Sequence, residues 1–177
     1  MDIFSIFGNI VFDIWSIILF LLGFFVSRYT QSKREKCQTS MDLSTRSESL
    51  IEKLDLKYKV FAIALNKFSK KKNQNINDFC EISITGESYI EQVRIICTAI
   101  LNNTLDAAAT KNNILSKIRD VAMITLPKYY DTLKYIAKRK GFQYNGEIKK
   151  EQNKCIIKVS YKYYSKKEIN GIIKDWK

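Results

Sequence analysis

The N-terminal 30 residues constrain this chain more than any other stretch, because they are almost free of charge. Between Ile3 and Val26 there is no Lys, Arg or Glu, and the only acidic residue is Asp13. A bilayer core of roughly 30 Å is crossed by about 20 apolar residues in a helix. The stretch therefore predicts one transmembrane helix within residues 1–30, with its span at about residues 8–28.

The basic residues predict how that helix is oriented. All 30 Lys and Arg residues lie after position 26, and segments with such positive flanks stay on the cytoplasmic side of a membrane. We expect a single-pass protein of the cell (inner or plasma) membrane, with its N-terminus outside and its C-terminal domain cytoplasmic. A cleaved signal peptide is the alternative, but the acidic N-terminus, the length of the run and the lack of an A-x-A site disfavour it.

The polar and small residues of the predicted span follow one line along the helix. They recur at steps of three, four and seven and are Asn9, Asp13, Ser16, Gly23 and Ser27. Such seams are where membrane helices pack on one another. We expect this transmembrane packing seam to hold a second copy of the chain or a partner membrane subunit. The alternative is that Asn9 and Asp13 merely lie in the outer interface and Gly23 is incidental.

Beyond residue 30 the sequence predicts a basic juxtamembrane linker (residues 31–49) and one helical domain (residues 50–177). The linker is polar and has no apolar period. Apolar residues at helical spacing then mark several segments, the first carrying Leu50, Leu54, Phe61, Leu65 and Phe68. Residues 80–85 and 157–163 alternate apolar and polar, which is typical of short strands, and residues 142–148 are a further candidate to pair with 157–163. We expect a mainly α (α+β) cytosolic domain of four or five helices with a small antiparallel sheet.

Local signals place the ends of the later helices. Thr85 and Gly86 resemble a helix start, with a buried face expected to include Tyr89, Val93, Ile96, Cys97 and Ile100. The next face carries Ile114, Leu115, Ile118, Val121 and Ala122. Pro127 is expected to end that helix and begin another, which Gly141 caps. Ser165 and Glu168 form a capping-box pattern before a last short helix.

Catalytic patterns are absent from the sequence. There is no histidine, so the Ser-His and Cys-His pairs and the usual general base are missing. The six glycines are not clustered into a phosphate-binding loop. We therefore expect a protein that is not an enzyme and holds no cofactor or metal.

The C-terminal third is strongly basic. From Pro127 onward there are 14 Lys or Arg residues against five acidic ones. An anionic-partner patch is expected at Lys134, Lys138, Arg139, Lys140, Lys158 and Lys162. Anionic lipid or an acidic protein would bind it, and a nucleotide or nucleic acid is the alternative because tyrosines lie among the lysines. A general richness in lysine along the chain would also produce this pattern.

Together these features favour a non-enzymatic, membrane-anchored protein that acts by oligomerisation or partner-subunit packing through its transmembrane helix. Its basic cytosolic domain would sense or bind a partner, as in a bacterial accessory or defence-type membrane effector. Two alternatives stay open from the sequence. One is a membrane-tethered binding module for a nucleotide or nucleic acid, and the other is a pore-forming oligomer.

Overall fold

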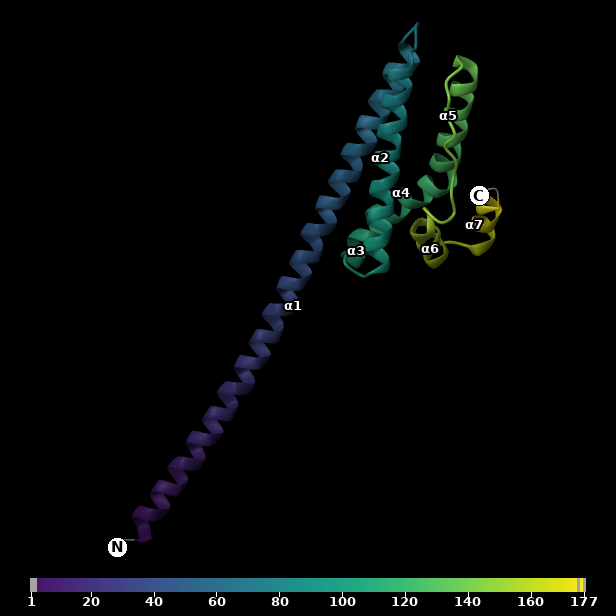
Figure 1. Ribbon diagram of the computed structural model, residues 1–177. Coiled ribbons are helices and arrows are strands. Elements are labelled where there is room, and N and C mark those ends of the chain that lie inside the picture. The colour runs from purple at the N-terminus through teal and green to yellow at the C-terminus, as the bar shows by residue number, and fades with distance from the viewer. Residues whose placement is uncertain (1–2, 175, 177) are drawn as a thin grey trace. The chain divides into compact units, whose positions relative to one another are not determined.

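The computed structural model describes the backbone of residues 3–174 and 176, and the side chains of residues 28–108, 110–171, 173, 174 and 176. The chain divides into two compact units, residues 1–42 and residues 43–177. The first helix, α1 (Ile3–Lys70), contributes to both (Figure 1).

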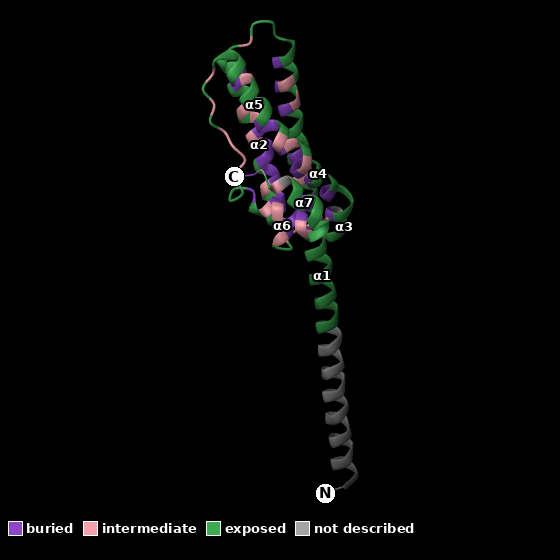
Figure 2. Ribbon diagram, turned by 90° about the vertical axis from the view of Figure 1, so that its right-hand side faces the viewer, coloured by how far each residue is buried: buried purple, intermediate pink, exposed green. Residues whose placement is uncertain are grey.

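In the first unit, the described side chains belong to residues 28–42, and all of them are exposed (Figure 2). This part of α1 is polar on every side, so it has no apolar face to bury. Local contacts support it instead: the Lys33 ammonium lies 4.8 Å from the centre of the Tyr29 ring, and the Thr39 hydroxyl donates to the Glu35 carbonyl. The predicted linker, residues 31–49, is thus helical throughout.

The membrane predictions require correction. Within the part of the chain that the structure describes, no helix has both the length and the apolar character needed to cross a bilayer. On this finding the single-pass fold and the membrane localisation expected from the sequence are not supported. Residues 8–27 of the predicted span, and with them the seam residues Asn9, Asp13, Ser16, Gly23 and Ser27, lie outside the residues whose side chains are described.

The second unit is built from helices alone over its described residues. After residues 43–70 of α1 come α2 (Ile76–Leu101), α3 (Ala107–Ala109), the π-helical turn η1 (Thr110–Ile114), α4 (Leu115–Asp120), the π-helical turn η2 (Val121–Thr125), α5 (Leu126–Lys140), α6 (Lys154–Tyr163) and α7 (Lys166–Ile173). The helical content predicted for this region is therefore confirmed. The small antiparallel sheet is wrong, since no strand occurs among the described residues.

The core forms where α2 returns along α1 and meets α5 (Figure 1). Phe61 of α1 stacks on Tyr89 of α2, with ring centres 6.3 Å apart, and meets the edge of Tyr129 of α5 at 5.7 Å. Most residues of the predicted faces are confirmed as core: Leu54, Phe61 and Phe68 are buried, as are Tyr89, Val93, Ile96, Cys97 and Ile100, and Ile114, Leu115, Ile118, Val121 and Ala122. Leu50 and Leu65 of the first face are half-buried against this core.

The two segments expected to be strands are helical because their buried residues follow a helical period. In α2, Phe79, Ile82 and Gly86 are buried at steps of three and four, so residues 80–85 belong to a helix that already begins at Ile76. In α6 the buried residues are Ile156, Val159 and Ser160. An alternating strand would have exposed Ser160, which is instead almost completely covered.

The structure confirms some of the expected helix ends and corrects others. Gly141 caps α5 in the left-handed conformation, with φ 72°, which a glycine adopts without strain. Pro127 lies in the first turn of α5 as expected. The helix start expected at Thr85 is wrong, because Asn75 caps α2 ten residues earlier through a capping box with Asp78. Ser165 precedes α7 but makes no side-chain capping bond.

Candidate interaction surface

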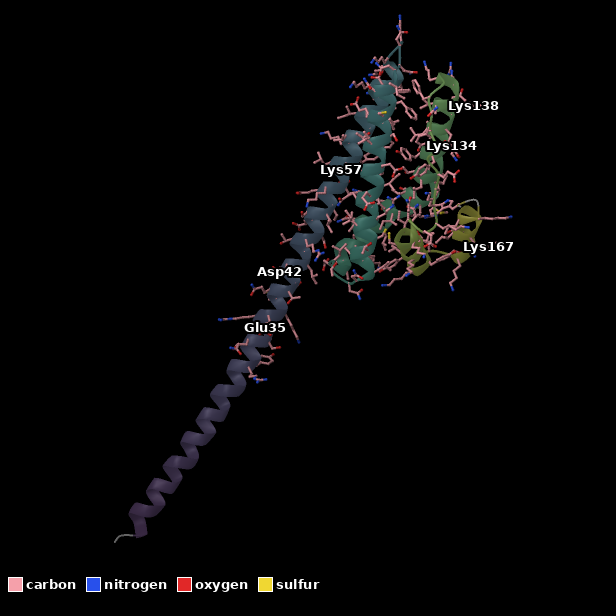
Figure 3. All side chains as sticks on the ribbon, viewed as in Figure 1. Glu35, Asp42, Lys57, Lys134, Lys138 and Lys167 are labelled. Atoms are coloured by element: carbon pink, nitrogen blue, oxygen red, sulfur yellow. The ribbon has the colours of Figure 1, made fainter. Side chains whose placement is uncertain are left out.

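The basic patch predicted from the sequence is split between two places. Lys134, Lys138, Arg139 and Lys140 are exposed on the last turns of α5, whereas Lys158 and Lys162 are exposed on α6. Figure 3 shows Lys134 and Lys138 toward the C-terminal end of α5, well away from α6. The six side chains therefore do not form one continuous surface, and binding of an anionic partner there stays a prediction.

The α5 group nevertheless borders a hollow of ≈ 560 Å³. Lys134 and Lys138 line it together with Phe142, Gln143 and Tyr144. On α6, the Lys162 ammonium instead lies 5.4 Å from the centre of the Tyr163 ring. The two basic groups thus have different surroundings.

A second surface, not predicted from the sequence, lies on residues 56–63 of α1. Leu56, Val60 and Ile63 are spaced at i, i+4 and i+7, so they form one stripe along the helix. Their side chains are 59%, 43% and 58% exposed. Large aliphatic residues are usually buried, and three in a row on one helical face are more informative than a single exposed one.

This stripe, Leu56, Val60 and Ile63, points away from the core face of the same helix. Leu54 and Phe61 hold the core face and are almost fully buried. At 100° per residue the stripe lies about 140° around α1 from those two residues. The helix therefore carries two apolar faces, and the domain covers only one of them.

Ion pairs join α1 to α2 near the loop between them. Lys67 lies 2.8 Å from Glu81, and Lys71 lies 2.7 Å from Asp78. The Glu81 hydrogen bond raises the pKa of Lys67, while the Lys71 hydrogen bond holds the pKa of Asp78 below its usual value. On α2, Ile84 stands one turn after Glu81 and is 68% exposed, and Ile76 and Ile95 of the same helix are exposed as well.

Lysines surround the stripe. Residues 50–71 contain six lysines and two acidic residues. Helical spacing puts Lys53 and Lys57 on one side of the stripe and Lys59 on the other, and none of the three forms an ion pair with a residue that the structure describes. One of the two acids, Asp55, is already paired with Lys117 at 2.5 Å. The surface is thus apolar at its centre and positive at its edges.

Among the described residues no three His, Cys, Asp or Glu side chains come together in a way that could hold a metal ion. The buried tyrosines serve the fold: the Tyr129 hydroxyl donates to the Ser83 carbonyl at 2.7 Å, and the Tyr130 hydroxyl donates to Glu87 at 2.6 Å. Burial raises the pKa of both hydroxyls, which keeps them protonated.

Comparisons with known proteins do not add a function. No protein-family model, no curated protein and no solved structure matches this chain.

The stripe itself has a weak signal in the sequence, since Leu56, Val60 and Ile63 repeat the spacing of a helical face. That signal is easily overlooked because the neighbouring Leu54, Phe61 and Phe68 form a longer face of the same kind.

Proposed function

We propose that residues 43–177 form a non-enzymatic protein-binding module that holds an acidic amphipathic helix of a partner protein on the outer side of α1. The observation that carries this proposal is the exposed stripe Leu56, Val60 and Ile63 bordered by the unpaired Lys53, Lys57 and Lys59. A helix that lays its own apolar face on such a stripe is a recurrent way in which helical surfaces bind partners.

The apolar contact supplies part of the affinity. About half of each stripe side chain is still exposed to solvent, so covering the three would contribute on the order of 3 kcal/mol. This is below the roughly 4–15 kcal/mol that association costs in lost freedom of motion. The interaction therefore needs the charged border and further contacts, and we expect a transient complex rather than a permanent one.

The charge of the border selects the partner. Six lysines against two acidic residues give residues 50–71 a net charge of +4. Acidic side chains on the partner helix would pair with Lys53, Lys57 and Lys59 and raise the rate of association. A second copy of the chain would place this positive border against itself, which like-charge repulsion disfavours.

The test uses the full chain and two synthetic helical peptides with the same leucine stripe at i, i+4 and i+7. One peptide has glutamates beside the stripe and the other has lysines. Fluorescence anisotropy should show binding of the glutamate peptide only, and binding should weaken as salt is added. Equal binding of both peptides, or binding of neither, would refute the proposal.

Variants then locate the contact. Leu56→Ser with Ile63→Ser should weaken binding of the glutamate peptide by about tenfold or more. Ile124→Ser is the matched control, because Ile124 is 49% exposed but lies in η2, and it should leave binding unchanged. Sedimentation of the full chain tests whether a second copy of the chain covers the stripe instead. If the chain self-associates and Leu56→Ser abolishes this self-association, the second copy is the occupant and the acidic-partner proposal is overturned.

A further inference from the structure

A groove between α1 and α2 gathers positive charge beside the stripe, and Lys53 belongs both to the groove lining and to the border of the stripe. Its volume is ≈ 490 Å³, and its lining includes Arg46, Ser49 and Lys53 of α1 and Glu91, Arg94 and Asn102 at the facing part of the chain. Three of these residues are cationic and one is acidic. Two of the six arginines in the whole sequence are among them, although lysines outnumber arginines fourfold.

Arg94 is held in a fixed position within this groove. Its Nε donates to Oδ1 of the fully buried Asn153 at 3.1 Å, and its Nη1 donates to Glu91 at 2.9 Å. The third nitrogen, Nη2, is buried and has no partner among the described residues. The side chain is 15% exposed, so its guanidinium is oriented by the protein and its hydrogen bonding is incomplete.

Among the described residues of the lining, one carboxylate opposes the charge of the groove. Glu91 pairs with Arg94, whereas Arg46 and Lys53 form no ion pair with any residue the structure describes. The hydroxyl of Ser49 and the side-chain amide of Asn102 add uncharged donors to the lining. A concave surface with an excess of cations focuses positive potential into the space between its walls.

We propose that this groove binds a phosphate group, with Arg46 and Lys53 contacting its oxygens and Arg94 supplying a fixed positive charge at the wall. Arginine suits this ligand because its planar donors match the oxygens of a phosphate. The groove is larger than one phosphate ion. It therefore has room either for free phosphate or for the phosphate end of a larger molecule such as a nucleotide.

Isothermal titration of the full chain tests the proposal with three probes: inorganic phosphate, pyrophosphate and ATP. Arg46→Gln combined with Lys53→Gln should weaken binding of pyrophosphate by about tenfold or more. Both side chains are exposed on α1, so the variant should fold. Lys134→Gln with Lys138→Gln is the control, because it removes the same charge from a different hollow.

The outcomes separate the sources of the ligand. If ATP binds more tightly than pyrophosphate, the groove also contacts the nucleoside; if the two bind equally, the phosphates alone are recognised. No binding of any probe would overturn the proposal, as would equal weakening by the control variant, which would indicate attraction to the net charge of +12 only. Arg46 lies outside the stripe, so Arg46→Gln alone should weaken pyrophosphate binding without changing binding of the acidic peptide.

Discussion

Gly86 of α2 lies directly against the ring of Tyr129 of α5, and a Cβ atom added at Gly86 would fall 2.3 Å from Cε2 of that ring. The same atom would lie 2.9 Å from Phe61 of α1. Tyr129 cannot swing aside easily, because it is buried and its hydroxyl is bonded to the Ser83 carbonyl. Three helices therefore meet at a position where only a hydrogen fits.

Gly86→Ala should destabilise the domain by about 1–2 kcal/mol. Overpacking a core costs about 1–3 kcal/mol, and the better helix propensity of alanine recovers up to about 1 kcal/mol. Chemical denaturation of the full chain measures the difference. Gly171→Ala in α7 is the control, since nothing lies within 4 Å of its added Cβ. An equal effect of the two variants would show that the contact with Tyr129 is unimportant.

Asn75→Ala should lower the free energy of unfolding by about 1 kcal/mol, because it removes the N-cap of α2. The Asn75 side chain accepts from the Asp78 backbone N–H, and the Asp78 carboxylate accepts from the Asn75 N–H, both at 3.0 Å. Asn73→Ala, two residues earlier and exposed, removes the same side chain without a cap. Thermal unfolding should separate the two variants, and coincident transitions would contradict the role of the cap.

Asn153→Ala should cost about 1–3 kcal/mol, because Arg94 Nε would lose its acceptor at a site from which water is excluded. Asn153 also donates to the Lys149 carbonyl at 2.9 Å, so the loop before α6 should loosen as well. Hydrogen exchange of the amides near residue 153 provides a local measurement. The comparison is Asn170→Ala, which breaks an exposed bond from Tyr161 and should change stability by less than about 0.5 kcal/mol.

Alkaline pH should destabilise the domain through Tyr89. Burial raises the pKa of this hydroxyl from 10.0 to about 12, so the unfolded chain loses the proton first. The contribution of the protonated Tyr89 hydroxyl to the free energy of unfolding is complete below pH 10. It is lost as pH rises from 10 toward 12, by up to about 1.4 kcal/mol per pH unit. Tyr89→Phe should therefore reduce the decrease in the free energy of unfolding between pH 10 and pH 12, as measured by chemical denaturation at each pH. Tyr135→Phe, at a 64% exposed side chain, should leave it as steep as in the wild type.

The helical faces of this protein are determined mainly by local sequence. Residues 89–100 and 114–122 repeat apolar side chains over several turns, and a pattern of that length fits a helix far better than a strand. Gly141 likewise ends α5 for a local reason, the left-handed conformation that it adopts. These features could be predicted without knowing what packs on them.

Short segments were decided by their neighbours. Ile157, Val159, Tyr161 and Tyr163 fit a strand by alternation, while Ile156, Val159 and Ser160 fit one face of a helix. A strand needs a partner for its backbone hydrogen bonds, whereas a helix satisfies them within itself. Residues 80–85 belong to α2 and residues 142–148 form no strand, and packing against α2 buried the helical face of α6.

The candidate sites depended on tertiary structure even more. The sequence groups six basic residues in the C-terminal third, but α5 and α6 carry them to separate places (Figure 3). The groove instead joins Arg46 to Arg94, which are distant along the chain, because α2 runs back along α1. The stripe Leu56, Val60 and Ile63 is exposed only because nothing in the described domain covers the outer side of α1.

The sequence by itself thus determined that the domain is helical, which faces of its longer helices are buried and where α5 ends. Only the tertiary structure decided the state of the short segments, the place of Gly86 and which cations share a groove. The physical reason is the distance along the chain over which each effect acts. Periodicity and capping act within a few helical turns, whereas a surface depends on which distant segments pack against it.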